Sequence, residues 1–479
     1  MERSLVTSPT RRRSIQDKCG IFAVHGDPRA SVKIINGLSL LEHRGQDSVG
    51  IGLHIEGFGF QSIPRNQGTA SEWFPGEHQI WAGDRGIGHN RYVTFGQASM
   101  DQVQPVMGAR LMLAHNGNLP DIEPLARFVE QHGRSLRGKN DSMLMHEAVD
   151  IGMQRGAKLP DAVRDVYELF RGAFSVVGMS GDTTVGFKDR YAVKPLAFGI
   201  DPDRAFVFSS ETRAFELGTK WREVGPGEML VVEDSRVQSE QLAPACSRPD
   251  SFEPIYFMRP DSEWEGKLVA EYRANFGREM AEQVREQGGP RAGLVLGVPD
   301  SAIIAARAFA AQLGIIYVED GIRKAGRVTQ RGFMTSEEGR EEFIRRKYQP
   351  VNSNFVNGQS VYVGDDSLIR GQTLHLGVVE KVRQAGARQV HGIIFSPPAI
   401  SSHEHGAYMP THDLVHFGRS TEEVARILGL DSLSFLTVDG LCRALGRTPD
   451  TVSNFAFTGT FLPETQHLSP IPQRQLAYA

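Results

Sequence analysis

The sequence contains only three cysteines in 479 residues, Cys19, Cys246 and Cys442. Three widely separated thiols are too few for a disulfide framework or a zinc site, and they favour a reducing, cytoplasmic location. No run of about 18 apolar residues is present, so we expect no membrane-spanning helix. The formal net charge of −4 gives no attraction to nucleic acid or to an anionic membrane. The length and the 40% hydrophobic content predict a globular chain of two or three domains.

The first 18 residues are basic, with Arg11-Arg12-Arg13, but lack the apolar core of a signal peptide. A disordered tail is the common fate of a terminus, and a propeptide is the alternative. We favour the propeptide because its removal would expose Cys19, which is followed by motifs described below.

The first half of the chain groups strand-like runs, then helical patterns, then strand-like runs again. This order predicts an α+β domain built in layers. The strand-like runs are 19–25, 49–54, 86–92, 110–115, 173–179, 184–188, 196–200, 205–209 and 228–233, and the helical patterns are 121–131, 142–154 and 159–170. Residues 234–252 are polar and irregular, which is typical of a linker.

The second half has a different rhythm, in which strands alternate with helices. Such alternation predicts a doubly wound α/β domain with a parallel sheet. The expected strands are 292–298, 314–318, 359–364 and 389–395, and the expected helices are 266–287, 301–313 and 373–386. We therefore expect a leader at 1–18, a first domain at 19–240, a second domain at 253–463 and a tail at 464–479.

Cys19 stands directly before the apolar run 20–24, so it would lie at the start of a strand. With the leader removed, its freed α-amino group, with an ordinary pKa of about 7.7–8.0, could accept the thiol proton. A lone cysteine is more often a buried small hydrophobic residue. The prediction of a nucleophile therefore depends on the motifs that accompany it.

Three motifs accompany Cys19. Asn116-Gly117 could form an ordinary hairpin turn, or the Asn116 amide and the Gly117 N–H could stabilise an oxyanion. Arg91 could bind a substrate carboxylate or form a surface salt bridge. Asp141 could bind an α-ammonium group or cap a helix.

Over residues 19–235 these motifs resemble the class II glutamine amidotransferases. Further segments share the resemblance, at 171–174, 194–196, 210–212 and 225–228. The resemblance implies an N-terminal-nucleophile (Ntn) glutaminase with αββα layers. Cys19 would attack the glutamine amide, Asn116 and Gly117 would stabilise the oxyanion, and Arg91 and Asp141 would hold the amino-acid end of glutamine.

The segment 361–373, VYVGDDSLIRGQT, joins an apolar strand to two acids and to a glycine-containing loop that opens a helix. Backbone N–H groups at such a helix start bind phosphate, and adjacent carboxylates suit ribose hydroxyls and Mg²⁺. The plainer alternative is an acidic turn that caps the helix. The whole segment resembles the loop of type I phosphoribosyltransferases that binds phosphoribosyl diphosphate (PRPP).

Further motifs on either side of this segment resemble one family in particular, the amidophosphoribosyltransferases. Members of this family are pentosyltransferases of purine synthesis. These motifs are 256–262, 298–301, 396–398, 431–433 and 457–459. The resemblance implies that ammonia made at Cys19 passes through an internal channel to C1 of PRPP, giving 5-phosphoribosylamine, glutamate and pyrophosphate.

The same resemblance assigns the transferase site. Ser301, Asp365 and Asp366 match the Mg²⁺–PRPP positions, and Lys324, Arg327 and Arg331 keep the positive charge that pyrophosphate needs. The residues expected around the 5-phosphate are Ser367, Leu368, Ile369, Arg370, Gly371, Gln372 and Thr373. Glutamine and PRPP are the expected partners, and the family suggests a homo-oligomer, either a dimer or a tetramer.

Some positions depart from the family pattern. One branch binds a 4Fe–4S cluster through four cysteines, whereas the matching positions here hold Asp250, His403, Ser453 and Ala456, so no cluster is expected. Loop 323–333 lacks the usual Tyr and Thr. Three alternatives therefore stay open: a specialised paralogue of secondary metabolism with altered coupling or donor, a non-catalytic regulator that binds PRPP or nucleotides, and a glutaminase with another acceptor. Inhibition by nucleotides is open as well.

Overall fold

The computed structural model describes residues 19–74, 81–91, 102–326, 337–403 and 409–460. The chain divides into two compact units. The first unit holds the described residues up to Arg273, together with 402–403 and 442–460, and the second unit holds 274–401 and 409–441. The domain boundaries inferred from the sequence stay a prediction, since they do not follow this division by contacts. None of the helices in the described ranges has the length and apolar character needed to cross a bilayer.

The first unit is built around antiparallel sheets. One sheet has the order β11-β9-β10-β1-β4-β2-β3 and the other has the order β13-β12-β8-β7-β6-β5. The strands of the first sheet are β1 (Gly20–His25), β2 (Ser48–Ile55), β3 (Gly59–Gln67), β4 (Arg85–Arg91), β9 (Ala197–Ile200), β10 (Phe206–Ser209) and β11 (Lys220–Glu223). Those of the second sheet are β5 (Val106–Met107), β6 (Met112–Asp121), β7 (Arg171–Ser180), β8 (Thr183–Lys188), β12 (Glu228–Glu233) and β13 (Arg236–Gln241).

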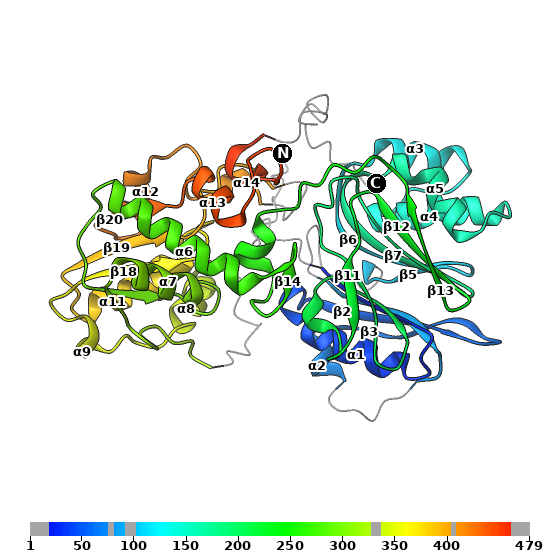
Figure 1. Cartoon of the computed structure of the whole chain (residues 1–479), viewed down its shortest axis with the longest axis horizontal. Helices are drawn as coiled ribbons and strands as arrows, with labels where there is room; N and C mark the ends of the chain where they lie inside the picture. Colours follow the sequence, from blue (N-terminus) through cyan, green and yellow to red (C-terminus); the bar gives the residue numbers. More distant parts are fainter. Residues whose placement is uncertain (1–18, 75–80, 92–101, 327–336, 404–408, 461–479) are drawn as a thin grey trace, which may run out of the picture. The chain divides into compact units, whose positions relative to one another are not determined.

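Three hydrophobic clusters stack these sheets and their helices into four layers. Side chains from both sheets, such as Ile21, Ile87, Ala114 and Val177, share one buried cluster, so the sheets pack face to face. A second cluster joins α1 (Ala30–Leu40) and α2 (Ala70–Trp73) to the first sheet, and a third joins α3 (Glu123–Gln131), α4 (Asp141–Gln154) and α5 (Leu159–Val166) to the second. Figure 1 shows α1 and α2 in blue and α3 to α5 in cyan, on opposite sides of the sheets. The predicted αββα arrangement is confirmed.

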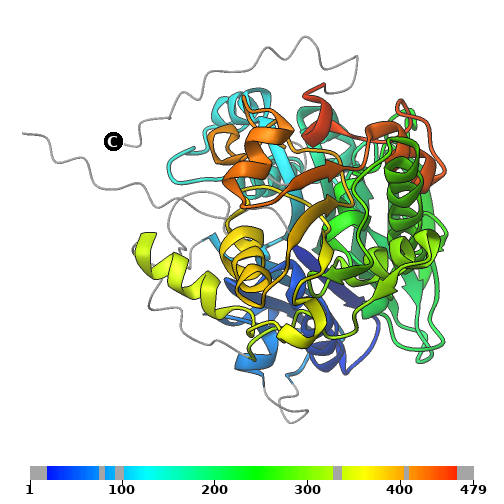
Figure 2. The same cartoon turned by 90° about the vertical axis from the view of Figure 1, so that its left-hand side faces the viewer.

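The second unit contains a parallel sheet of order β17-β16-β18-β19-β20. Its strands are β16 (Leu294–Gly297), β17 (Ile316–Tyr317), β18 (Ser360–Asp365), β19 (Gln389–Ile394) and β20 (Ser432–Phe435). The helices are α6 (Val269–Glu286), which leads into this unit, α7 (Ile303–Leu313), α8 (Glu337–Arg346), α9 (Ser353–Val356), α10 (Gln372–Leu374), α11 (Glu380–Gln384), α12 (Thr421–Ile427) and α13 (Val438–Leu445). Figure 2 shows helices on both sides of the strands, which confirms the predicted doubly wound class.

The strand order of this sheet reverses direction at one point, the switch point. From β16 the chain turns to β17 on one side, whereas β18 and then β19 and β20 follow on the other side. In open parallel sheets, ligands bind outside the carboxyl ends of the strands where the order reverses in this way. Here those ends are Gly297 and Asp365, which lie on paired strands.

Several local elements differ from the sequence predictions, and two of them are instructive. Residues 236–241, expected in an irregular linker, form β13, which pairs along its whole length with β12. The side chains of this edge strand are mostly exposed on both faces, so the strand has the polar composition that is typical of a loop. Helix α1 was not predicted at all. Its mixed sequence ASVKIINGLSL contains a glycine, and Gly37 packs so closely on the Phe22 ring that an added Cβ would lie 2.4 Å from it.

Candidate functional site

Cys19 is partly exposed and lies immediately before β1. Gly20 pairs with Asn90 of β4 across the sheet, so the antiparallel register brings the end of β4, at Arg91, beside the cysteine. The Arg44 guanidinium donates a hydrogen bond from Nε to the Cys19 carbonyl oxygen at 3.0 Å. The backbone of the predicted nucleophile is therefore held from the sheet and from a buried cation.

Asn116 and Gly117 lie inside β6, not in a hairpin turn. They pair with Ser175 and Phe174 of β7, so the turn alternative is wrong. Gly117 has φ +145°, and an added Cβ would lie 2.0 Å from the Ala173 carbonyl oxygen, so only glycine fits. The Asn116 side chain is 1% exposed, and its Nδ2 has no hydrogen-bond partner among the described residues. A buried amide donor without a partner suits an oxyanion that arrives with substrate.

A buried polar network connects the remaining glutamine-site candidates. His89 of β4 contacts the His115 carbonyl oxygen through Nε2 at 3.3 Å, which ties β4 to β6 one residue before Asn116. His115 Nδ1 lies 3.1 Å from Ser142 Oγ and 3.8 Å from Asp141 Oδ2. Burial lowers the pKa of His115, so its ring is neutral at neutral pH. The network thus ties His115, the strand residue before Asn116, to the start of α4, where Asp141 lies.

Arg91 and Asp141 take clear positions. Arg91 is 7% exposed and donates from Nη2 to Gln102 Oε1 at 2.9 Å. Asp141 is the first residue of α4, and the helix cap is Asn140, whose Oδ1 accepts from the Met143 N–H at 3.0 Å. Asn140 is therefore the cap of α4, and the Asp141 carboxylate accepts from the Ser142 N–H at 2.8 Å in the first turn of the same helix. This contact is compatible with a second contact to substrate.

In the second unit, Asp365 ends β18 and Asp366 follows it at the switch point of the sheet. The Asp366 carboxylate accepts hydrogen bonds from the Ser301 hydroxyl and, at 2.5 Å, from Ser367 Oγ. Burial, with the neighbouring Asp366 charge, raises the pKa of Asp365 well above its ordinary value. Two adjacent buried carboxylates with a hydroxyl are oxygen ligands of the kind that Mg²⁺ prefers.

The loop after these acids has the form expected of a phosphate site. Leu368 is buried, Ile369 accepts from the Val415 N–H through its carbonyl oxygen at 2.7 Å, and Gly371 has φ +74° at the start of α10, which contains Thr373. Within the described part of the chain, the buried atoms Arg370 Nη1 and Gln372 Oε1 have no hydrogen-bond partner. The acidic turn is thus part of a loop that carries an unused guanidinium donor.

The basic loop is described only in part. Lys324 Nζ pairs with the Asp300 carboxylate, which lies next to Ser301. Arg327 and Arg331 lie outside the described residues. Sequence reasoning missed Lys347, which neighbours Tyr348, the antiparallel bridge partner of Lys324. Burial lowers the pKa of the Lys347 ammonium, and the charge of Asp365 opposes that shift.

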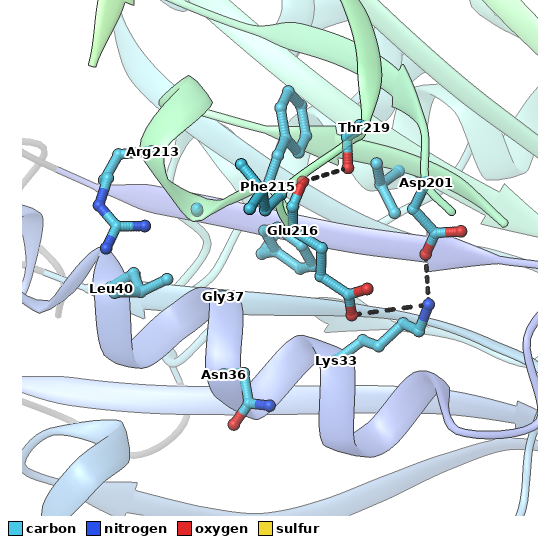
Figure 3. Close-up of a pocket in the computed structure, with 13 residues that line it drawn as sticks. Lys33, Asn36, Gly37, Leu40, Asp201, Arg213, Phe215, Glu216 and Thr219 are labelled. Carbon is cyan, nitrogen blue, oxygen red and sulfur yellow. Dashed lines mark hydrogen bonds and ion pairs between the residues drawn. The ribbon is translucent and has the colours of Figure 1, made fainter. Parts of the chain in front are cut away.

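A separate cavity of about 210 Å³ lies in the first unit and is lined by none of the predicted site residues. Figure 3 shows Lys33 pointing toward Asp201 and Glu216 at this cavity. Asp27, Asp201 and Asp203 also come within ligand distance of one another, but the Lys33 ammonium pairs with all three carboxylates. The Lys33 ammonium therefore already occupies the position between these carboxylates.

The positions matched to iron–sulfur cysteines also lie in the first unit. Asp250 Oδ2 is 2.8 Å from His403 Nε2, both side chains are 1% exposed, and Asp250 forms a β-bridge with Ser453. Ala456 is buried in α14 (Phe455–Thr458). The absence of a cluster stays a prediction. Of the other cysteines, Cys442 is buried and Cys246 is exposed.

Comparisons with known proteins agree with this geometry. A family model described as a glutamine amidotransferase domain matches residues 89–217. An amidophosphoribosyltransferase of Bacillus subtilis (strain 168) is 34% identical over 475 residues, covering 96% of this chain and 97% of that protein. One of Pyrococcus horikoshii is 35% identical, covering 89% and 93%. The solved glutamine PRPP amidotransferase of B. subtilis, complexed with ADP and GMP, has a TM-score of 0.81 at 32% identity, covering 92% of this chain and 97% of that one.

Proposed function

Because this chain belongs to the amidophosphoribosyltransferase family, we propose that its two candidate sites carry out the two halves of one reaction. The first unit hydrolyses glutamine at Cys19, and the second transfers the ammonia to C1 of PRPP, giving 5-phosphoribosylamine, glutamate and pyrophosphate. The observation that carries the proposal is that one chain holds both a buried, unpartnered Asn116 amide on the strand network of Cys19 and two adjacent buried carboxylates at a switch point.

In the glutaminase half, the Cys19 thiolate attacks the carboxamide carbon, and the freed α-amino group of Cys19 accepts the thiol proton. The Asn116 Nδ2 and the Gly117 N–H donate to the oxyanion, which gives the buried amide the partner that it lacks in this structure. Arg91 pairs with the α-carboxylate of glutamine and Asp141 with its α-ammonium group. Ammonia leaves, and water then hydrolyses the thioester to release glutamate.

In the transferase half, Asp365 and Asp366 would hold the ribose hydroxyls and Mg²⁺, with the Ser301 hydroxyl beside them. Mg²⁺ would offset the negative charge that grows on the pyrophosphate as it leaves. Arg370 and the backbone of residues 367–373 would hold the 5-phosphate, and Lys324, Arg327 and Arg331 would approach the pyrophosphate. Ammonia needs no general base, so positioning and electrostatic stabilisation provide the catalysis.

The proposal is tested by following glutamate and pyrophosphate together, with glutamine, PRPP and Mg²⁺ supplied to protein whose start at Cys19 is verified by intact mass. We expect equal amounts of both products. Cys19→Ala should abolish glutamine use but keep synthesis from ammonium chloride. The paired change Asp365→Ala with Asp366→Ala should keep glutamine hydrolysis and lose pyrophosphate release. Glutamine turnover by Cys19→Ala would exclude the assigned nucleophile.

A solved relative was described with ADP and GMP bound. Nucleotide inhibition of this chain is therefore a further proposal, tested by adding each nucleotide to the coupled assay. Assembly into a homo-oligomer is tested by light scattering of the same preparation.

A further inference from the structure

Arg44 is the centre of a fully buried group of charges in the first unit. It ends the short 3-10 helix η1 (Glu42–Arg44), and its side chain is 0% exposed, as are those of Glu211 and Glu253. Nη1 donates to Glu211 Oε1 at 2.7 Å, and Nη2 donates to the Glu253 carboxylate at 3.0 and 3.2 Å. The remaining donor, Nε, reaches the Cys19 carbonyl oxygen. All three nitrogen atoms are used, so the guanidinium has one orientation.

Both carboxylates are themselves held. Glu211 Oε2 accepts from the Arg259 N–H at 3.0 Å and from Ser262 Oγ at 2.7 Å. Burial alone would raise the pKa of Glu211, but His43 and Arg44 outweigh it and keep the pKa well below its ordinary value. The carboxylate is therefore ionised across the neutral range and available to orient Arg44.

Glu253 comes from a different part of the sequence than the other members. It begins the π-helical turn η5 (Glu253–Phe257), which lies beyond the expected end of the glutaminase domain at residue 240 and beyond the matched family segment 89–217. Lys194 Nζ lies 3.4 Å from Glu253 Oε1 and 5.4 Å from the centre of the Phe257 ring. This turn is thus tied into the first unit by charge and by packing.

We propose that Glu253 is a positioning residue of the glutaminase, which acts through Arg44 to fix the backbone of Cys19. Nη2 donates to both oxygens of Glu253, so glutamine at this position would remove the negative charge and replace one accepting oxygen by an NH2 donor. The buried guanidinium must then turn or admit water. Either response moves Nε from the Cys19 carbonyl oxygen. Because a displacement of the order of 1 Å between reacting groups lowers rates by up to about 100-fold, the thiol would attack less often from a correct position.

This inference rests on the proposed glutaminase function, and the measurements separate the two. We expect Glu253→Gln in the full-length protein to lower kcat for glutamine by about 10-fold to 100-fold, with little change in KM, because Arg91 and Asp141 still bind the amino-acid end. Synthesis from ammonium chloride should be unchanged. Alkylation of Cys19 by a diazoketone analogue of glutamine should slow by a similar factor.

Two further variants show whether Glu253 acts through Arg44. Arg44→Lys keeps the positive charge but loses the three-nitrogen guanidinium, so its kcat for glutamine should fall by a similar factor. The double variant of Arg44→Lys with Glu253→Gln should be no slower than the slower of the two single variants. Asp261→Asn is the matched control, since Asp261 pairs with Arg259 and Arg213 on the exposed side of the same segment. It should leave kcat unchanged.

Each outcome has a distinct meaning. No glutamine turnover by the wild type would overturn the proposed function, whereas normal wild-type turnover with an unaffected Glu253→Gln variant would overturn only the role of Glu253. A fully additive double variant, or a rise in KM alone, would also overturn that role. If Glu253→Gln does not fold, Glu253→Asp keeps the charge one methylene farther from Arg44 and should show the same loss in kcat with unchanged KM.

Discussion

The two units treat buried charge in opposite ways. In the first unit, the Arg44 guanidinium lies between the carboxylates of Glu211 and Glu253, and every member of the group has a partner of opposite charge. In the second unit, Asp365 and Asp366 lie side by side, so burial and the like charge of Asp366 raise the pKa of Asp365, and the Lys347 ammonium opposes that shift. The balanced group contacts the Cys19 carbonyl oxygen, and we propose that it holds this residue in place before substrate arrives. The unbalanced pair has excess negative charge that a cation can offset.

The largest effect is expected when one carboxylate of the Asp365–Asp366 pair is removed. Asp365→Asn should lower pyrophosphate release from PRPP by roughly a thousandfold or more, because electrostatic stabilisation carries that half of the reaction. It should also raise the melting temperature of metal-free protein, since it removes a buried carboxylate whose pKa is raised by burial and by Asp366. Calorimetry of both proteins with a chelator measures the second effect. A lower melting temperature would mean that the Asp365 carboxylate stabilises the metal-free protein. It would contradict the contrast between the Arg44 group and the two aspartates.

A smaller effect is expected at Asn116, the proposed oxyanion donor of the first unit. Asn116→Ala should lower kcat for glutamine by about 100-fold to 1,000-fold, the usual result of removing one oxyanion donor. Binding of glutamine should change little, and synthesis from ammonium chloride should remain. Steady-state kinetics with both nitrogen donors measures this. An equal loss with ammonium chloride would mean that the variant disturbs the whole protein and not the oxyanion site.

The smallest effect is expected for the ion pair between Glu228 and Arg222, which is less buried than the Arg44 group. It shows how much a partly exposed ion pair contributes to the free energy of unfolding. Glu228 bonds to Arg222 at 2.6 and 2.8 Å. Burial acts to raise the pKa of Glu228, but Arg222, Ser239 and the Gly225 N–H lower it from 4.5 to about 2. A lowered folded-state pKa stabilises the protein above pH 4.5, and that stability is lost as the pH falls from 4.5 toward 2.

Glu228→Gln should therefore lower the free energy of unfolding by about 1 kcal/mol at pH 6, after allowance for solvent screening of the partly exposed arginine. The difference from wild type should shrink as the pH falls below 4.5. Urea unfolding at a series of pH values measures it. A difference that grows toward acid pH would contradict the assigned direction of the pKa shift.

The sequence predicted those parts of the sites that are local in the chain. Asp365, Asp366 and the following loop lie within nine residues of one strand end, so a strand pattern followed by acids was enough to locate them. Cys19 and Asn116-Gly117 were recognisable in the same way, as short motifs beside apolar runs. Their assigned roles stay predictions until the variants are measured.

The rest of the arrangement depends on contacts that no local pattern encodes. Arg44 and Glu253 are separated by 209 positions, and nothing in the sequence around Glu253 distinguishes it from a surface glutamate. The structure was also needed to show that Asn140 caps α4 and that the Asn116-Gly117 pair lies inside a strand. In these cases the structure gave the location of the side chain, and its role stays a prediction.

The anchoring of Asp250 has a consequence for how the protein is made. Asp250 and its turn are tied to His403 and Ser453, so the first unit includes chain that is synthesised long after its sheets. About 200 residues separate Glu253 from Ser453, which at 5–20 residues per second is a delay of roughly 10–40 s during translation. The contacts of Asp250 with His403 and Ser453 form only after much of the transferase sheet has been synthesised. A nascent chain therefore does not gain a fully ordered glutaminase before the unit that consumes its ammonia exists.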